Sequence, residues 1–255
     1  MYYKLMSNFD SINPENILFL DVGNTAIKGA FRREANWQAL HDGELKTASD
    51  LIRWIEKHPA EFTGFVLSSV RKEVTEAIRH ELNPLLVKAL EVSDIPADFL
   101  DYESPETLGI DRFLACFGAV SHTKEAVVVI DAGTATTIDF ISTEEVFCGG
   151  LIVPGFSAFM DILHQKAPAL PVVETELPEK WPGKSTIDSL KWGQAGFYKH
   201  GIEQTLKKFE EEFGNFDLFL TGGDAVKVEA LLEREGKIRP FLVFDGMERL
   251  LNIEH

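Results

Sequence analysis

Two segments of the chain end in nearly the same group of polar residues. Residues 17–25 read I-L-F-L-D-V-G-N-T, and residues 127–137 read V-V-V-I-D-A-G-T-A-T-T. Each begins with a run of aliphatic side chains, which is typical of a strand buried on both faces. The run ends in Asp, one further residue and Gly, so a carboxylate lies at the strand's tip, where the glycine lets the backbone turn and a ligand approach. The hydroxyl and N–H groups that follow are suited to phosphate oxygens.

The two aspartates, Asp21 and Asp131, are 131 − 21 = 110 residues apart, which suggests two similar halves that face one nucleotide. A single Asp-x-Gly motif followed by Asn or Thr is also an ordinary turn, since Asp, Gly and Asn are common turn residues. The second copy, in the same strand context, favours the interpretation as a pair of phosphate-binding turns.

A third candidate site is Gly109-Ile110-Asp111-Arg112, at the start of a predicted helix. Asp111 can simply be a helix cap, which stabilises a helix by about 0.5–2 kcal/mol. Alternatively, its carboxylate takes a proton from a hydroxyl nucleophile while the neighbouring guanidinium holds an anionic group. Residues 149–155 and 221–225 are further glycine-bearing strand ends that precede helices, where N–H groups can face a nucleotide.

These motifs are positioned by an alternation of strands and helices that occurs twice. In the first half we predict strands at 17–21, 28–31, 64–70 and 85–92, and helices at 49–57, 72–82 and 111–122. In the second half we predict strands at 127–131, 136–141, 146–152, 216–220 and 241–244, and helices at 156–165, 185–213, 224–234 and 247–252. A proline-rich loop separates the first two of these helices, and the boundary between the halves is placed near residues 121–126.

The bulk properties exclude several classes of protein. Hydrophobic residues make up 45% and charged residues 26% of the 255 residues, as in ordinary globular proteins. The formal net charge of −16 argues against a nucleic-acid surface, which needs a basic footprint. Cys116 and Cys148 are too few for a disulfide framework and are predicted to be buried free thiols. No apolar stretch is long enough to span a membrane, residues 1–16 are interpreted as a polar extension rather than a signal peptide, and we expect a cytoplasmic protein.

The order and spacing of these motifs resemble those of the type III pantothenate kinases, members of the sugar-kinase/actin-like ATPase superfamily. The resemblance extends from Ile17 to Leu251 and rests on residues 21–25, 68–70, Tyr102, Pro105, 109–112, 131–137, 149–155, 169–171, Gly183, Thr186, Gly193 and 221–225. It implies an α/β protein of two RNase H-like (actin-like ATPase) halves, residues 17–121 and 126–255. Each half would be a mixed sheet flanked by helices, with the nucleotide in the cleft between them.

The resemblance also implies ATP-dependent phosphorylation of pantothenate to 4'-phosphopantothenate, the first step of coenzyme A biosynthesis. Asp111 would be the general base, and pantothenate would contact Tyr102, Gly109, Ile110, Asp111, Arg112 and Thr186 in a site at a homodimer interface. ATP would contact Asp21, Val22, Gly23, Asn24, Thr25, Ala26, Ile27, Lys28 and Thr134. Asp131 would ligate a monovalent cation, K⁺ or NH₄⁺, and Mg²⁺ would accompany ATP near Asp21.

Three features depart from the family pattern. Ala26 stands where relatives often carry Arg, Lys184-Ser185 replace a more usual Asn before Thr186, and residues 1–16 are an additional extension. None of them affects Asp21, Asp111 or Asp131. Two other functions stay open from the residues alone: an actin-like or chaperone-like ATPase module, which would turn over ATP without pantothenate, and a non-catalytic transcriptional accessory factor. The negative charge argues against direct DNA contact by the second.

Overall fold

The computed structural model describes residues 14–40, 45–58, 62–82 and 87–253. Their contacts divide the chain into two compact units, residues 1–121 with 241–255, and residues 122–240. Most of the predicted N-terminal extension and the start of the predicted strand 85–92 lie outside the described residues. No helix in the described ranges is both long enough and apolar enough to cross a membrane.

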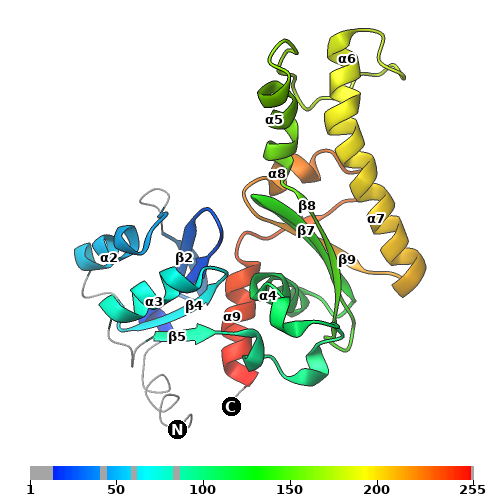
Figure 1. The fold of residues 1–255 in the computed structure, drawn as a ribbon. Coiled ribbons are helices and arrows are strands. Elements are labelled where there is room, and N and C mark those ends of the chain that lie inside the picture. The colour runs from blue at the N-terminus through cyan, green and yellow to red at the C-terminus, as the bar shows by residue number, and fades with distance from the viewer. Residues whose placement is uncertain (1–13, 41–44, 59–61, 83–86, 254–255) are drawn as a thin grey trace. The chain divides into compact units, whose positions relative to one another are not determined.

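The first unit contains a mixed five-stranded sheet in the order β3-β2-β1-β4-β5 (Figure 1). Its strands are β1 (Ile17–Val22), β2 (Ile27–Arg33), β3 (Asn36–Ala39), β4 (Gly64–Ser69) and β5 (Val87–Leu90). The pairs β1–β2 and β2–β3 are antiparallel, whereas β4 is parallel to β1 and β5 is parallel to β4. The carboxyl ends of β1 and β4 therefore meet at one edge of the sheet, beside the β1–β2 turn.

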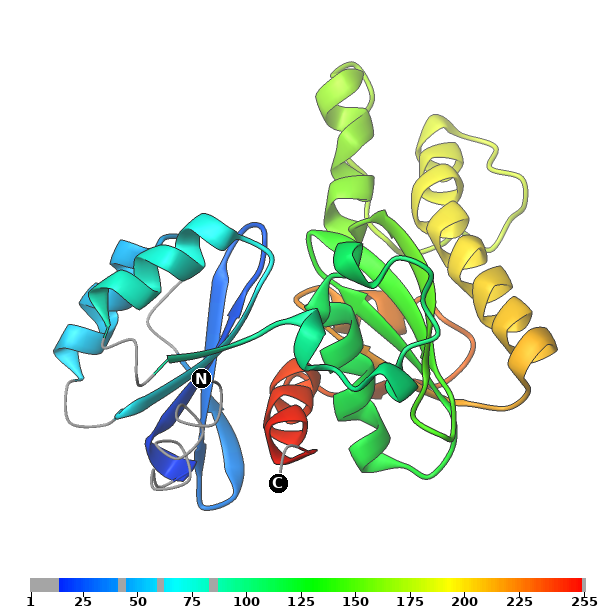
Figure 2. The ribbon, with the colours of Figure 1, turned by 60° about the horizontal axis from the view of Figure 1, so that its bottom comes forward.

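Helices cover both faces of this sheet (Figure 2). On one face lie α2 (Ala48–Lys57) and α3 (Lys72–Glu81), whose Leu51 and Ile78 pack against Leu18 and Leu20 of β1. On the other face lie α4 (Ile110–Ala119) and α9 (Leu242–Ile253). Short 3₁₀ turns occupy Pro14–Asn16, Val92–Asp94, Ala97–Phe99, Pro105–Thr107 and Val120–His122.

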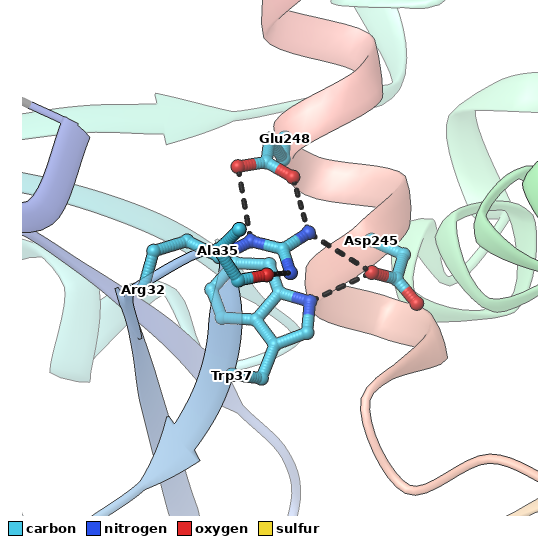
Figure 3. A network of polar contacts seen from close by, with 5 residues as sticks. All are labelled: Arg32, Ala35, Trp37, Asp245 and Glu248. Carbon is cyan, nitrogen blue, oxygen red and sulfur yellow. Dashed lines mark hydrogen bonds and ion pairs between the residues drawn. The ribbon is translucent and has the colours of Figure 1, made fainter.

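A polar network attaches α9 to the β2–β3 hairpin (Figure 3). The Arg32 guanidinium donates to both carboxylate oxygens of Glu248, at 3.2 and 2.6 Å, and reaches Asp245 at 3.4 Å. The Trp37 indole N–H donates to the same Asp245 at 2.7 Å, and the Arg32 guanidinium lies 4.0 Å from the centre of the Trp37 ring. The four side chains thus bind a C-terminal helix to the hairpin that follows the first Asp-x-Gly turn.

The secondary structure predicted for residues 241–252 was wrong. Residues 241–244 were predicted as a strand and 247–252 as a separate helix, but residue 241 lies in a turn and residues 242–252 belong to the single helix α9. A run of four apolar residues fits a short strand and a helix turn equally well, and here the buried positions continue through Met247 and Leu250 at helical spacing. The last strand is the two-residue β10 (Lys237–Ile238). Residues 241–255 are grouped with the first unit, whereas the sequence prediction placed them in the second half.

Glycines allow α4 and α9 to pack with their backbones in close contact. A Cβ at Gly118 would collide with the Leu242 carbonyl oxygen and lie 2.8 Å from the Gly246 nitrogen, and a Cβ at Gly246 would collide with the Leu114 carbonyl oxygen. Because backbone atoms cannot rotate away, an added methyl group must separate the helices. The start of α4 carries Asp111, so this packing also supports a candidate site residue.

We expect Gly118→Ala to lower the free energy of unfolding by about 1–3 kcal/mol, the usual cost of overpacking. The matched control is Gly201→Ala, at an exposed position of helix α7 (Phe197–Phe213) in the second unit, where an added Cβ meets nothing within 4 Å. That change should stabilise by about 0.5–1 kcal/mol, because alanine loses less backbone entropy than glycine. Denaturant unfolding of the three proteins measures both effects, and equal stability of Gly118→Ala and wild type would refute the packing argument.

The second unit repeats the sheet of the first. Its strands are β6 (Val127–Ala132), β7 (Ala135–Ile141), β8 (Phe147–Pro154), β9 (Asp217–Thr221) and β10, in the order β10-β9-β6-β7-β8. As in the first unit, the first three strands in sequence form an antiparallel meander, and the fourth and fifth add in parallel on the other side of the first. The predicted fold class of two similar α/β halves with mixed sheets is therefore confirmed.

The helices of the second unit are α5 (Phe156–Lys166), α6 (Thr186–Lys191), a π-helical turn (Trp192–Gly196), α7 (Phe197–Phe213) and α8 (Ala225–Glu229). The predicted helical region 185–213 is continuous from α6 to α7, whereas α8 is shorter than the predicted helix 224–234. Tyr198, Ile202 and Leu206 of α7 pack on the sheet with Val128 and Ile130. Both cysteines are free thiols; Cys116 is buried as predicted, and Cys148 is only partly buried.

Candidate functional site

The first Asp-x-Gly turn joins β1 to β2. Asp21 is paired in the sheet with Lys28 on β2 and with Ser68 on β4, and the Ser68 hydroxyl donates to the Asp21 carboxylate at 3.0 Å. The turn is closed by a hydrogen bond from the Gly23 N–H to the Ala26 carbonyl oxygen at 3.0 Å. The carboxylate is therefore held at the strand tip, directly before the turn.

The residues predicted to bind ATP in this turn differ in exposure. Asn24, Thr25 and Lys28 are exposed, so an amide, a hydroxyl and an ammonium group can reach a ligand. Val22 and Ile27 are buried in the core on the α2/α3 face of the sheet, so their side chains are occupied by packing. They can meet a ligand only through their backbone atoms.

The second Asp-x-Gly turn joins β6 to β7 and has the same construction. Asp131 is paired with Thr137 on β7 and with Thr221 on β9, and the turn is closed by the Gly133 N–H and the Ala135 carbonyl oxygen at 3.1 Å. Thr134, the residue predicted to bind ATP here, is exposed.

The two turns differ in the charge beside each aspartate. Paired residues of neighbouring strands point to the same face of a sheet. Asp21 therefore has the Lys28 ammonium as a neighbour, whereas Asp131 has two threonines. The hydroxyl oxygens of the two threonines are suitable additional ligands for a cation bound at Asp131.

Gly222 leaves room around the second turn. Its φ is 91°, in the left-handed region, and a Cβ there would lie 2.5 Å from the Asp131 carboxylate and 2.5 Å from the Ala132 carbonyl oxygen. A side chain at this position would therefore displace the carboxylate or the turn. The sequence motif at residues 221–225 thus contacts the predicted cation ligand directly.

Asp224, in the same motif, links two helix starts. Its carboxylate accepts hydrogen bonds from the Ser157 N–H at 3.1 Å, the Ser157 hydroxyl at 2.9 Å and the Lys227 ammonium at 2.8 Å. Burial acts to raise the pKa of Asp224, but the hydrogen bonds from Lys227 and Ser157 outweigh it and hold that pKa below its ordinary value. Asp224 was not among the predicted site residues, and only the glycine motif around it pointed to this position.

Asp111 is the second residue of α4, whose N-cap is Gly109. It therefore does not cap the helix, which was the alternative role that its sequence context allowed. The Arg112 N–H donates to the Asp111 carboxylate at 3.0 Å, and a Cβ on Gly109 would lie 2.6 Å from it. Burial raises the pKa of Asp111, against the opposing effects of Arg112 and of the Lys28 ammonium. The result is a more basic carboxylate than an exposed aspartate has.

Arg112 and Tyr102, both predicted to bind pantothenate, lie together. The Arg112 side chain is buried, and its guanidinium donates to the Tyr102 hydroxyl at 3.4 Å. Ile110 is buried as well, so it contributes backbone atoms and packing to this part of the molecule. A buried guanidinium next to a carboxylate with a raised pKa is an arrangement typical of a site that binds an anionic substrate and moves a proton.

Thr186, the remaining predicted substrate residue, is in the second unit. It is the first residue of α6 and is exposed, while the preceding Ser185 caps the helix by accepting from the Asp188 N–H at 3.1 Å. Its hydroxyl is therefore accessible and is not used for capping.

The predicted cation sites do not contain clusters of acidic or histidine ligands. Within the described ranges, no group of three or more His, Cys, Asp or Glu could hold a metal ion. Any cation at Asp21 or Asp131 would need further oxygen atoms from hydroxyls, backbone carbonyls or the ligand itself, which is how Mg²⁺ is commonly held beside phosphates.

Comparison with known proteins identifies the family. Residues 17–208 match the family model described as type III pantothenate kinase. A type III pantothenate kinase of Flavobacterium johnsoniae is 32% identical over 215 residues, covering 82% of this chain and 86% of the relative. Another, of Paramagnetospirillum magneticum, is 29% identical over 254 residues, covering 89% and 95%.

A solved structure supports the fold. The crystal structure of a conserved putative Baf family transcriptional activator from Campylobacter jejuni matches with a TM-score of 0.64 at 24% identity, over 93% of this chain and 98% of that one. Since the family model spans most of the chain and the Flavobacterium johnsoniae relative is 32% identical over most of both chains, the chain belongs to the type III pantothenate kinase family.

Proposed function

We propose that the chain transfers the terminal phosphoryl group of ATP to the hydroxyl of pantothenate, the first step of coenzyme A biosynthesis, with Asp111 as the general base. The observation that carries the assignment of the base is the environment of Asp111. Its side chain is partly buried, its pKa is raised, and it is positioned by the Arg112 N–H at a helix start. Such a group accepts a proton from an alcohol more readily than an exposed aspartate does.

In this reaction the pantothenate hydroxyl loses its proton to Asp111, its oxygen bonds to the terminal phosphorus of ATP, and ADP leaves. The Arg112 guanidinium and the Tyr102 hydroxyl, which are in contact, hold the acidic substrate so that its hydroxyl faces Asp111. The rest of Gly109-Ile110-Asp111-Arg112 contacts the substrate through the backbone at the helix start.

The two Asp-x-Gly turns bind the phosphates of ATP. In the first, the exposed Asn24, Thr25 and Lys28 supply an amide, a hydroxyl and a positive charge, and in the second the exposed Thr134 supplies a hydroxyl. Asp21 would hold Mg²⁺, since a single carboxylate combined with phosphate oxygens is a usual Mg²⁺ environment. The ion would neutralise charge on the phosphates.

We assign a monovalent cation, K⁺ or NH₄⁺, to Asp131. Its sheet neighbours, Thr137 and Thr221, carry neutral oxygen donors, and Gly222 leaves the carboxylate uncrowded. A fixed cation there would stabilise the negative charge of the phosphates.

We expect activity to fall sharply when Na⁺ or Li⁺ replaces K⁺, because a site of fixed oxygen ligands discriminates between cations by size. Asp131→Ala should abolish the response to K⁺, and Glu212→Ala, which removes an exposed carboxylate of α7, should leave it intact. Initial rates measured at constant ionic strength over a K⁺ titration test this. Equal wild-type rates in Na⁺ and K⁺ would contradict the assignment.

We also propose that the active form is a homodimer. Most of the large apolar side chains that the described residues expose lie between β8 and the start of α7, among them Ile152, Val172, Trp181, Ile187 and Phe197. In Figure 1 this region, with α5 and α6, extends beyond the sheet of its unit. Exposed apolar surface of this extent indicates an interaction site, and a second copy that covers it would also approach Thr186.

A coupled assay of ADP release, with and without pantothenate, tests the proposed function. A kinase releases ADP only when pantothenate is present. Steady ADP release without pantothenate would identify an ATPase module instead. No release under either condition, in the presence of K⁺ and Mg²⁺, would favour a non-catalytic role.

A further inference from the structure

Two buried side-chain nitrogens in the described residues have no hydrogen-bond partner, and both belong to Arg71: Nε and Nη2. A guanidinium stays charged at any pH at which the protein is folded. The N–H groups on Nε and Nη2 therefore lose their hydration on burial without gaining a hydrogen bond, which is rare in folded proteins and needs an explanation.

The two unpaired nitrogens form one edge of the guanidinium. The third nitrogen, Nη1, donates to the Lys46 carbonyl oxygen at 3.2 Å and fixes the orientation of the group. The Nε and Nη2 atoms lie side by side and direct two parallel N–H bonds away from the Lys46 carbonyl oxygen. This geometry matches two oxygens of one phosphate or carboxylate.

Arg71 lies beside the first Asp-x-Gly turn. Its own N–H donates to the Ser69 hydroxyl at 3.0 Å, directly after β4, and the Val70 N–H donates to the Val22 carbonyl oxygen at 3.1 Å. At the other end of the side chain, Lys46 follows Leu45, whose carbonyl oxygen accepts from the Ile27 N–H at 2.6 Å. The Arg71 side chain thus connects the two segments that are bonded to the last residue of β1 and the first residue of β2.

We propose that Arg71 is a phosphate-binding residue, and that its Nε/Nη2 edge donates to two oxygens of one phosphate group of the nucleotide bound at residues 23–26. This inference rests on the proposed function. Lys28 provides the second positive charge at the same turn, and Asn24 and Thr25 are exposed there. Because both Arg71 nitrogens are shielded from water, the phosphate reaches them only when the groups that cover them move aside.

A carboxylate would fit the same edge, and the acidic substrate pantothenate carries one. The position of Arg71 beside an Asp-x-Gly turn favours phosphate, because that turn offers further donors for phosphate oxygens. A purely structural role, in which Arg71 only ties the segment before α2 to the end of β4, predicts no selective effect on either substrate.

The test compares Arg71→Gln and Arg71→Lys with Arg79→Gln, which changes an arginine of α3, the helix that follows Arg71, where Arg79 is paired with Glu76. We expect Arg71→Gln to raise the KM for ATP about 10–100-fold, as for the loss of a charge-assisted bidentate contact. The KM for pantothenate should stay within about twofold of wild type. Arg71→Lys keeps the charge but not the paired donors and should be intermediate, and Arg79→Gln should match wild type in both constants.

The outcomes separate the alternatives. An ATP KM within twofold of wild type in both Arg71 variants would overturn the proposal, and a rise confined to the pantothenate KM would assign the edge to the carboxylate instead. If Arg71→Gln does not fold, Arg71→Lys decides by the same two constants. If wild type shows no pantothenate-dependent ADP release, the proposed function fails. Arg71 can then still be tested by nucleotide binding: the increase in melting temperature on addition of Mg²⁺ and a non-hydrolysable ATP analogue is compared between wild type and the variants.

Discussion

Asp111→Asn is expected to lower kcat about 10²–10⁴-fold, the usual contribution of a positioned general base. The amide keeps the size of the side chain and accepts the Arg112 N–H bond through its oxygen, but it cannot take the substrate's proton. ATP binding should be retained, because the substitution removes a negative charge near Lys28 and leaves the Lys28 ammonium and the donors of the two turns in place. Steady-state kinetics combined with a binding measurement for an ATP analogue distinguish the two effects.

The pH dependence supplies an independent check. Only the ionised carboxylate accepts a proton, so kcat/KM should rise with pH through the pKa of Asp111, which burial places above that of an exposed aspartate. Asp111→Asn should remove this rise from the residual activity. Asp98→Asn, which changes an exposed aspartate of the same unit, should leave both rate and profile unchanged. Turnover near that of wild type in Asp111→Asn would contradict the role of Asp111 as the general base and leave it only a structural role at the start of α4.

The sequence predicted the two Asp-x-Gly turns because local features define them. An aliphatic run forms the buried strand, and the residues after it form the turn, so Asp21 and Asp131 lie where their neighbours in the chain require. Strand β3 was not predicted, because Asn36–Ala39 has no buried residue and its pairing with β2 is what makes it a strand. Residues 241–244 were misassigned for the related reason that contact with α4, rather than local pattern, selects the helix.

Arg71 and Asp224 show which part of a site single-sequence reasoning misses. The Arg71 guanidinium is oriented by the carbonyl oxygen of Lys46, 25 residues away, which accepts from Nη1. Asp224 connects two helix starts because the N–H and the hydroxyl of Ser157, 67 residues away, both donate to its carboxylate. Neither partner forms a recognisable motif with its residue. Contacts between segments distant in sequence have no local periodicity or spacing, so they become visible only in the folded chain.

The dependence of catalysis on a dimer is expected to appear as complementation between two inactive variants. The family resemblance places Thr186 in the pantothenate site of the neighbouring subunit. In the structure Thr186 is exposed at the start of α6, in the region that carries the exposed apolar side chains. Asp111→Asn and Thr186→Ala should each be defective as homodimers, since every site then contains one altered residue.

Co-expression of the two variants should restore activity. In a two-fold heterodimer, the site with the Asn at position 111 also receives the altered residue 186 of its partner, so one site carries both changes. The other site combines an unchanged Asp111 with an unchanged Thr186 and is intact. Each heterodimer should therefore recover up to about half of the wild-type activity, by the symmetry of the interface.

The measurement needs heterodimers purified through two different affinity tags, so that the remaining homodimers do not contribute. The control pairs Asp111→Asn with Asp111→Asn carrying the second tag, which should stay inactive because no site regains the base. If Thr186 serves the site of its own chain, every site in the heterodimer keeps one altered residue and no activity returns. A solution mass near 28.6 kDa, that of one chain, would contradict the dimer itself.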